Sequence, residues 1–209
     1  MVEYFIGVDL GQKRDYTAVA IVERDGDRLC LRHLEHLKLN TSYQAVADRI
    51  QQLNRMTMAH GPVTLMVDAT GVGLGVLDDL ESRGLKPIGI TITSGRAIST
   101  TGKRSRVPKR DLVVRLLTDL ESGRLKISSG IPDAEKLIDE LLGFKVQINR
   151  RTGQESFGAA SAKHDDFVLA LALACWGAQR GGNLLTESGR VLGPSPRHRV
   201  PQPSAPRKR

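Results

Sequence analysis

The sequence predicts a mixed α/β fold in which helices cover a single sheet. Three observations lead to this prediction. Short apolar and β-branched runs of strand length follow one another near the start, with no helix-like segment between them. Further along, strand-like runs alternate with segments in which apolar residues recur every three or four positions. The chain has 209 residues, which is enough for one sizeable domain and its core.

The first three elements are expected to be strands of an antiparallel meander. Residues 4–9 form a short apolar run that ends in a carboxylate, and residues 17–24 form a β-branched run. Asp25-Gly26 then favours a tight turn into residues 27–37, which alternate in part between apolar and polar side chains. Strands joined by a tight turn pair in opposite directions.

A helix and a buried strand come next. Apolar residues at helical spacing predict a helix from Ser42 to about Ala59, and Gly61-Pro62 terminates it. Residues 63–69 form a continuous apolar run that includes an aspartate near its end. Such a run is typical of a strand that is buried on both faces of the sheet.

The rest of the ordered chain continues the alternation. Glycine and proline mark most boundaries, because they end or begin helices. In order we expect a helix ending at Gly84, a strand at 86–93, a polar basic loop at 94–107, a helix from Pro108 to Gly123, a short strand at 124–127, a helix at 132–144, a hairpin at 145–158 and a last helix from near Lys163.

Residues 181–209 differ in composition from the domain expected at 1–180. They hold six basic residues, one acidic residue and five of the nine prolines, so they carry +5 of the formal net charge of +8. A segment with no apolar periodicity is expected to be disordered, and this one could contact phosphates without reading sequence. A solvated extension that aids solubility is the alternative.

Several classes of protein are excluded or disfavoured by the composition. No apolar run reaches the roughly 18 residues of a membrane span, and no secretory signal pattern is visible. Cys30 and Cys175 lack the spacing of metal ligands and predict reduced thiols in the cytoplasm. The positive net charge indicates a polyanionic partner.

Aspartates stand at the ends of two predicted strands and at the start of the last helix. They are Asp9, Asp68 and the pair Asp165-Asp166. Strand-end carboxylates lie at the rim of the sheet, where ligand sites of α/β folds collect, although turn or capping roles explain each aspartate singly. Clustered carboxylates select hard cations such as Mg²⁺ or Mn²⁺, and two such ions can assist phosphodiester hydrolysis.

The segments GVDLG, VDATGVG and HDD, in this order and in these structural positions, resemble the nuclease domain of phage terminase large subunits. These domains belong to the RNase H-like (retroviral integrase) superfamily, and the resemblance extends from residue 4 to about residue 180. It implies an RNase H-like mixed sheet, with three antiparallel strands followed by parallel strands and the fourth strand beside the first. It also implies that Asp9, Asp68 and Asp166 are catalytic ligands of two Mg²⁺ or Mn²⁺ ions, with Asp165 as a further ligand.

Other residues are candidates for supporting roles. Asp15 matches an accessory acidic position of some terminases, with a turn aspartate as the alternative. His164 is a candidate for contacting substrate or positioning a ligand, with a plain helix start as the alternative. A basic group is expected to follow a DNA backbone unless it is a solvated loop, and it consists of Lys103, Arg104, Arg106, Lys109, Arg110 and Lys163.

The predicted function is that of a two-metal-ion endonuclease that cleaves double-stranded DNA in the bacterial host cytoplasm during phage DNA packaging. The sequence contains no P-loop motif, so an ATPase motor is an expected partner, together with packaging proteins such as the portal and the small terminase. The alternatives are a Holliday junction resolvase-like nuclease and a non-catalytic DNA-binding packaging protein. A kinase or ATPase of the actin-like fold needs two subdomains, and this chain has room for one.

Overall fold

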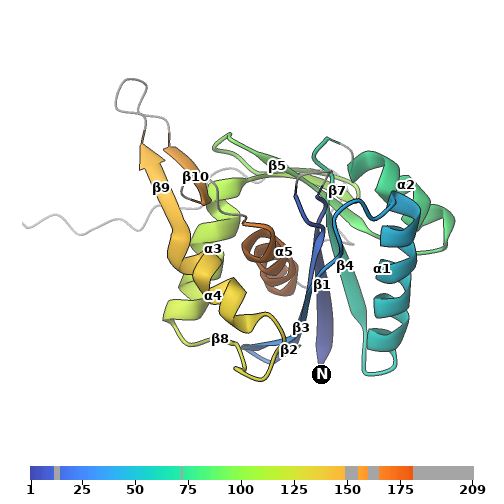
Figure 1. The fold of residues 1–209 in the computed structure, drawn as a ribbon, viewed down its shortest axis with the longest axis horizontal. Coiled ribbons are helices and arrows are strands. Elements are labelled where there is room, and N and C mark those ends of the chain that lie inside the picture. The colour runs from blue at the N-terminus through green and yellow to red at the C-terminus, as the bar shows by residue number, and fades with distance from the viewer. Residues whose placement is uncertain (12–14, 72, 149–154, 160–164, 181–209) are drawn as a thin grey trace, which may run out of the picture.

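The computed structural model describes residues 1–11, 15–71, 73–148, 155–159 and 165–180, and its fold is drawn in Figure 1. The strands are β1 (Glu3–Asp9), β2 (Ala18–Asp25), β3 (Arg28–His36), β4 (Val63–Asp68), β5 (Ile88–Thr93), β6 (Ser99–Thr101), β7 (Arg104–Pro108), β8 (Leu125–Lys126), β9 (Phe144–Ile148) and β10 (Glu155–Ala159). The helices are α1 (Tyr43–Met58), α2 (Gly73–Ser82), α3 (Lys109–Glu121), α4 (Ala134–Gly143) and α5 (Asp166–Arg180). None of the helices described is long and apolar enough to cross a membrane.

One eight-stranded mixed sheet forms the centre of the molecule, in the order β6-β7-β5-β4-β1-β2-β3-β8. Strands β1, β2 and β3 pair antiparallel, and β4 runs parallel beside β1. Strands β5 and β7 continue in the same direction. The expected mixed sheet, its opening meander and the placing of the fourth strand beside the first are therefore confirmed.

Helices cover both faces of this sheet, as Figure 1 shows, with α1 and α2 on one face and α3, α4 and α5 on the other. Each face has its own core. Side chains of α1, α2 and one side of β1 and β4 form the first core, which includes Val8 and Val67. Side chains of α5, α3 and the other side of the same strands form the second, which includes Phe5 and Met66.

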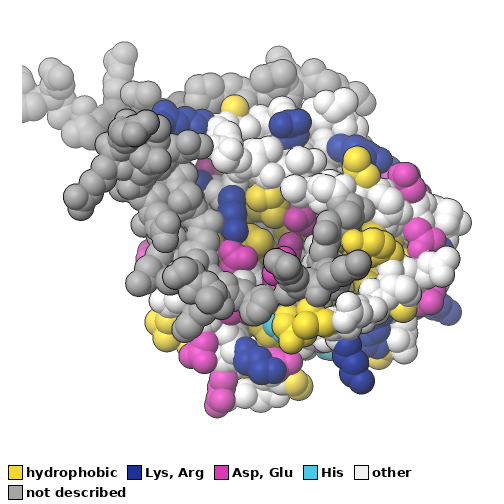
Figure 2. Space-filling model, turned by 45° about the horizontal axis from the view of Figure 1, so that its top comes forward, with side chains coloured by type: hydrophobic (Ala, Val, Ile, Leu, Met, Phe, Trp, Pro, Cys, Tyr) yellow, Lys and Arg dark blue, Asp and Glu magenta, His cyan; other side chains and the backbone are white. Residues whose placement is uncertain are grey.

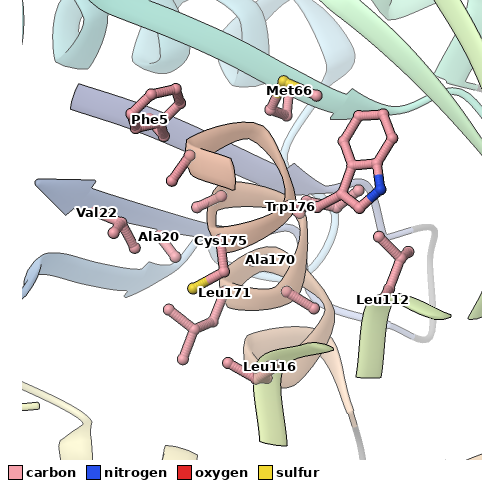
Figure 3. Close-up of a cluster of buried hydrophobic side chains, with 14 of the residues drawn as sticks. Phe5, Ala20, Val22, Met66, Leu112, Leu116, Ala170, Leu171, Cys175 and Trp176 are labelled. Atoms are coloured by element: carbon pink, nitrogen blue, oxygen red, sulfur yellow. The ribbon is translucent and has the colours of Figure 1, made fainter. Parts of the chain in front are cut away.

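Helix α5 lies directly on β1. It is buried along almost its whole length and is rich in alanine, so its backbone can approach the sheet closely. Gly7 permits this approach, because a Cβ at that position would lie 2.0 Å from the carbonyl oxygen of Ala170. Figure 3 shows Phe5, Met66 and Trp176 gathered around the helix. The contact sets where α5 begins relative to the end of β1.

Helix α1 agrees closely with the sequence prediction. The hydroxyl of Ser42 caps it by accepting a hydrogen bond from the backbone N–H of Ala45 at 3.2 Å. The helix ends at Met58, one residue before the predicted boundary. The capping residue and the apolar spacing are local features, which explains the agreement.

The polar basic segment 94–107 was predicted as a loop, and this prediction is wrong. It contains β6 and most of β7, and β7 pairs with β5. Ser105 and Val107 are buried on one face of β7, while Arg104 and Arg106 are exposed on the other. The alternation has the period of a strand, but a serine in a core position and two arginines conceal it.

Candidate active site

Asp9 and Asp68 lie next to each other at the carboxyl ends of two parallel strands. Val8 of β1 is in register with Val67 of β4, so each aspartate occupies the next position along its strand. Alternate residues of a strand point to the same face, and Phe5 and Met66 belong to the core around α5. Both carboxylates therefore project from the sheet on the side of α5.

The start of α5 brings two further carboxylates to this edge. Asp166 is buried, and its Oδ2 accepts a hydrogen bond from the backbone N–H of Tyr16 at 3.3 Å. Asp165 is partly buried, and its Oδ2 accepts a hydrogen bond from Lys109 Nζ at 2.7 Å. The acidic cluster, defined as Asp9, Asp68, Asp165 and Asp166, thus combines residues from three distant parts of the sequence.

Lys109 reaches the cluster because of the direction of β7. Strands β1, β4, β5 and β7 are mutually parallel, so their carboxyl ends share one edge of the sheet. Lys109 directly follows β7 and begins α3. It was predicted as a DNA-binding residue, and the structure places its ammonium group in an ion pair with Asp165.

The charges of the cluster repel one another. The pKa of Asp9 is raised well above its ordinary value, first by burial and then by the neighbouring carboxylates of Asp68, Asp166 and Asp165. Lys109 opposes this shift. Burial also raises the pKa of Asp68, and this effect is partly offset by hydrogen bonds from Thr70. A cation bound among these groups would stabilise their charged forms.

Thr70 holds the carboxylate of Asp68 in place. Its hydroxyl and its backbone N–H both donate to Asp68 Oδ1, at 2.6 Å and 2.8 Å. The same hydroxyl accepts a hydrogen bond from the backbone N–H of Ile92 at 3.0 Å. Asp68 is therefore connected to β5 as well as to its own strand.

The donor set fits a hard divalent cation, because it consists of carboxylate oxygens. Among the residues that the structure describes, no three His, Cys, Asp or Glu side chains are already arranged around a common metal position. An incoming ion would have to draw the carboxylates closer together. Rotation of the aspartate side chains, with release of Asp165 from Lys109, would supply this adjustment.

The remaining predicted residues are distributed over several places. Asp15 is exposed in the connection after β1. Arg104 is 3.7 Å from Asp78 of α2 and so lies on the opposite side of the sheet from α5. Lys103, Arg106 and Arg110 are exposed. His164, Lys163 and the predicted tail at 181–209 fall outside the described residues.

His36 is a residue near the cluster that the sequence prediction missed. Asp9 pairs with Ala18, and Ala18 pairs with His36, so the three residues form one row across β1, β2 and β3. The imidazole of His36 stacks against the rings of Tyr16 and Phe167, with centroid distances of 4.8 Å and 3.5 Å. Its Nε2 lies 4.0 Å from Asp166 Oδ2. Only the register of the sheet reveals this proximity.

Glu140 of α4 is a second residue that was missed. Its side chain is buried, and Oε2 accepts hydrogen bonds from the backbone N–H groups of Phe167 at 3.0 Å and Val168 at 3.2 Å. Burial raises the pKa of Glu140 to about 7, although these hydrogen bonds favour its charged form. In the sequence it is one of several acidic residues on an amphipathic helix, and no local signal distinguishes it.

A family model described as the terminase RNase H-like domain matches residues 6–176. This chain belongs to that family. No curated protein sequence matches the chain at a significant level. The matched region of this terminase RNase H-like domain includes the whole acidic cluster, from Asp9 to Asp166.

Solved structures of large terminases have the same fold. The large terminase nuclease of thermophilic phage G20c has a TM-score of 0.61 and 21% identity, with 83% of this chain and 81% of that chain covered. The same nuclease with bound magnesium has a TM-score of 0.61 and 22% identity, with 84% and 81% covered. The large terminase of another thermophilic bacteriophage has a TM-score of 0.63 and 12% identity, with 82% of this chain but only 38% of that chain covered.

We expect the metal-free terminase domain to become less stable as pH rises from about 5 to about 7. The folded-state pKa values of Asp9, Asp68 and Glu140 are raised, so the folded chain holds more protons in this range than the unfolded chain. The free energy of unfolding then decreases with increasing pH. Urea denaturation at several pH values, in EDTA and in Mg²⁺, measures the effect.

Mg²⁺ should flatten this pH dependence, because a bound cation stabilises the charged carboxylates. Asp9→Asn should flatten it in EDTA, because it removes one member of the cluster. A stability in EDTA that stays constant or rises between these pH values would contradict the expected repulsion.

Proposed function

We propose that this chain is a divalent-metal-dependent endonuclease that hydrolyses double-stranded DNA, and that it is the nuclease part of a phage DNA-packaging terminase. The observation that carries the proposal is the acidic cluster at the carboxyl ends of β1 and β4. Four carboxylates from distant segments converge there, at a cost shown by the raised pKa of Asp9. Such repulsion is useful at a site that binds cations.

Asp9, Asp68 and Asp166 are the proposed catalytic metal ligands, and Asp165 is a proposed additional ligand. Two Mg²⁺ or Mn²⁺ ions would activate a water and stabilise the leaving oxygen of the phosphodiester. Strands β1 and β4 hold Asp9 and Asp68 rigidly, and Thr70 orients the carboxylate of Asp68. The backbone N–H of Tyr16 holds Asp166 from the other side.

Lys109 is proposed to have two roles. In the absence of metal it pairs with Asp165 and reduces the repulsion within the cluster. When Asp165 turns toward a cation, the ammonium group becomes available to a phosphate oxygen of the substrate. Lys109 would then contact the DNA backbone at the cleaved bond, as a residue that neutralises charge.

The likeness to the G20c nuclease supports the choice of cation, since structures of that protein contain magnesium or cobalt. Manganese is included because the same oxygen ligands suit it. Asp15 and His164 remain proposed accessory residues for the same site.

Basic side chains are proposed to guide the DNA toward the cluster. Figure 2 shows acidic side chains in a hollow of the surface, with basic side chains beside it and along the rim above. The proposed DNA contacts include the exposed Lys103, Arg106 and Arg110. Arg104 and Lys163 complete the proposed set, and the expected assembly includes an ATPase motor, a portal and a small terminase in the host cytoplasm.

Incubation with supercoiled plasmid in Mg²⁺, Mn²⁺ or EDTA tests the proposed function. We expect nicking and linearisation that depend on the metal. A gel shift without any cleavage in either metal would reject the nuclease and favour a non-catalytic DNA-binding protein. Much faster cleavage of a four-way junction than of a linear duplex would instead favour a resolvase-like activity.

A further inference from the structure

The first turn of α5 is held by a side chain from a different helix. We propose that Glu140 of α4 is a positioning residue, which fixes this turn so that Asp165 and Asp166 face Asp9 and Asp68. This inference rests on the proposed function, because it concerns the geometry of the same site. Glu140 itself is not proposed to bind metal or substrate.

The contact supplies what a helix start normally lacks. The first N–H groups of an α-helix have no acceptor within the helix, and a side chain just before the helix usually accepts from one of them. In α5 the Oε2 atom of Glu140 accepts from both Phe167 and Val168. One carboxylate from α4 therefore satisfies two consecutive groups of α5.

Asp165 occupies the place from which a helix is usually capped. Its carbonyl oxygen accepts the hydrogen bond of Leu169 N–H at 3.0 Å, and its side chain is of a type that favours capping. Its carboxylate nevertheless bonds to Lys109, at the edge where the acidic cluster lies. Because Glu140 takes over the capping contacts, the carboxylate of Asp165 can remain with the cluster.

The burial of Glu140 argues that this contact matters. Its side chain is buried on the same helix as Leu137, where an apolar side chain would avoid the cost of removing a carboxyl group from water. The two N–H donors offset part of that cost. Phe167 directly follows Asp166 in the sequence, so a shift of this turn would move Asp166 away from Tyr16 and Asp9.

Four variants separate positioning from a simple gain in stability. Glu140→Leu removes the acceptor, Glu140→Gln keeps the reach without the charge, and Glu140→Asp keeps the charge but shortens the reach. Glu135→Leu changes an exposed residue of the same helix in the same way as Glu140→Leu and serves as the control. Mg²⁺ binding is measured by calorimetry, and hydrogen exchange is measured at the amides of Phe167 and Val168.

We expect Glu140→Leu to weaken Mg²⁺ binding about tenfold or more, as is usual when the residue that orients a ligand is lost. The two amides should exchange faster. Glu140→Gln should stay close to the wild type and Glu140→Asp should resemble Glu140→Leu, because reach to the two N–H groups is the property required. In cleavage, the Mg²⁺ concentration at half-maximal rate should rise more than the rate at saturating Mg²⁺ falls.

Unchanged Mg²⁺ affinity and unchanged amide exchange in folded Glu140→Leu would overturn the proposal. If that variant does not fold, the comparison of Glu140→Gln with Glu140→Asp decides, and closer-to-wild-type behaviour of Glu140→Asp would overturn it. A wild-type chain that binds Mg²⁺ but does not cut DNA would reject the proposed function alone. In that case the binding and exchange measurements still test the role of Glu140.

Discussion

Asp68→Asn should leave the fold intact and reduce DNA cleavage at least about a hundredfold, since a metal ligand contributes several kcal/mol to the transition state. The amide can still accept the hydrogen bonds from Thr70, but it binds a hard cation far more weakly than a carboxylate does. Cleavage of plasmid at saturating Mg²⁺ or Mn²⁺ measures the loss. Circular dichroism and urea denaturation report on the fold.

The metal-free variant should also be more stable than the wild type near pH 7. Asp68 contributes to the raised pKa of Asp9, so its removal relieves repulsion in the cluster. Asp139→Asn is a matched control, because Asp139 is an exposed aspartate of α4 outside the cluster. Turnover by Asp68→Asn at the rate of the wild type would reject the role proposed for this residue.

Gly7→Ala should destabilise the protein by about 3 kcal/mol, at the upper end of the usual cost of overpacking. The added Cβ would lie 2.0 Å from Ala170 O and 2.6 Å from Ala174 N. Both atoms belong to the backbone of α5, so no side-chain rotation can relieve the clash. Urea denaturation measures the change in the free energy of unfolding.

Gly75→Ala is the matched control for this change. Gly75 is exposed within α2, and a Cβ there meets no atom within 4 Å. This variant should be more stable than the wild type by roughly 0.5–1 kcal/mol, because alanine favours the helix. If Gly7→Ala were as stable as the wild type, the close contact between α5 and β1 would be wrong.

Much of the fold was predictable because its signals are local. The turn at Asp25-Gly26 predicted the pairing of β2 with β3, and Ser42 predicted the start of α1. Segment 94–107 was missed because Ser105 does not look like a core residue, and pairing with β5 is what buries it. Leu74 was expected on the buried face of α2, and it is 46% exposed because Val76 and Leu77 face the core instead.

The candidate site was predictable only in its aspartates. Asp9 and Asp68 stand out because a carboxylate ends an apolar strand, and the resemblance to terminase nucleases ranked Asp166 beside them. Glu140 and His36 could not be found in this way, because they reach the site through helix packing and sheet register. Their neighbours in the sequence carry no trace of those contacts.

The order of strands and helices, and the presence of carboxylates at their ends, follow from residue patterns, because turns, caps and apolar periodicity act over a few positions. The partners of those carboxylates depend on contacts between residues far apart in the chain. Gly7 lets α5 settle against β1, and the direction of β7 brings Lys109 to Asp165. Charge repulsion and its relief act through space, so the packing of α5 on the sheet decided the chemistry of the cluster.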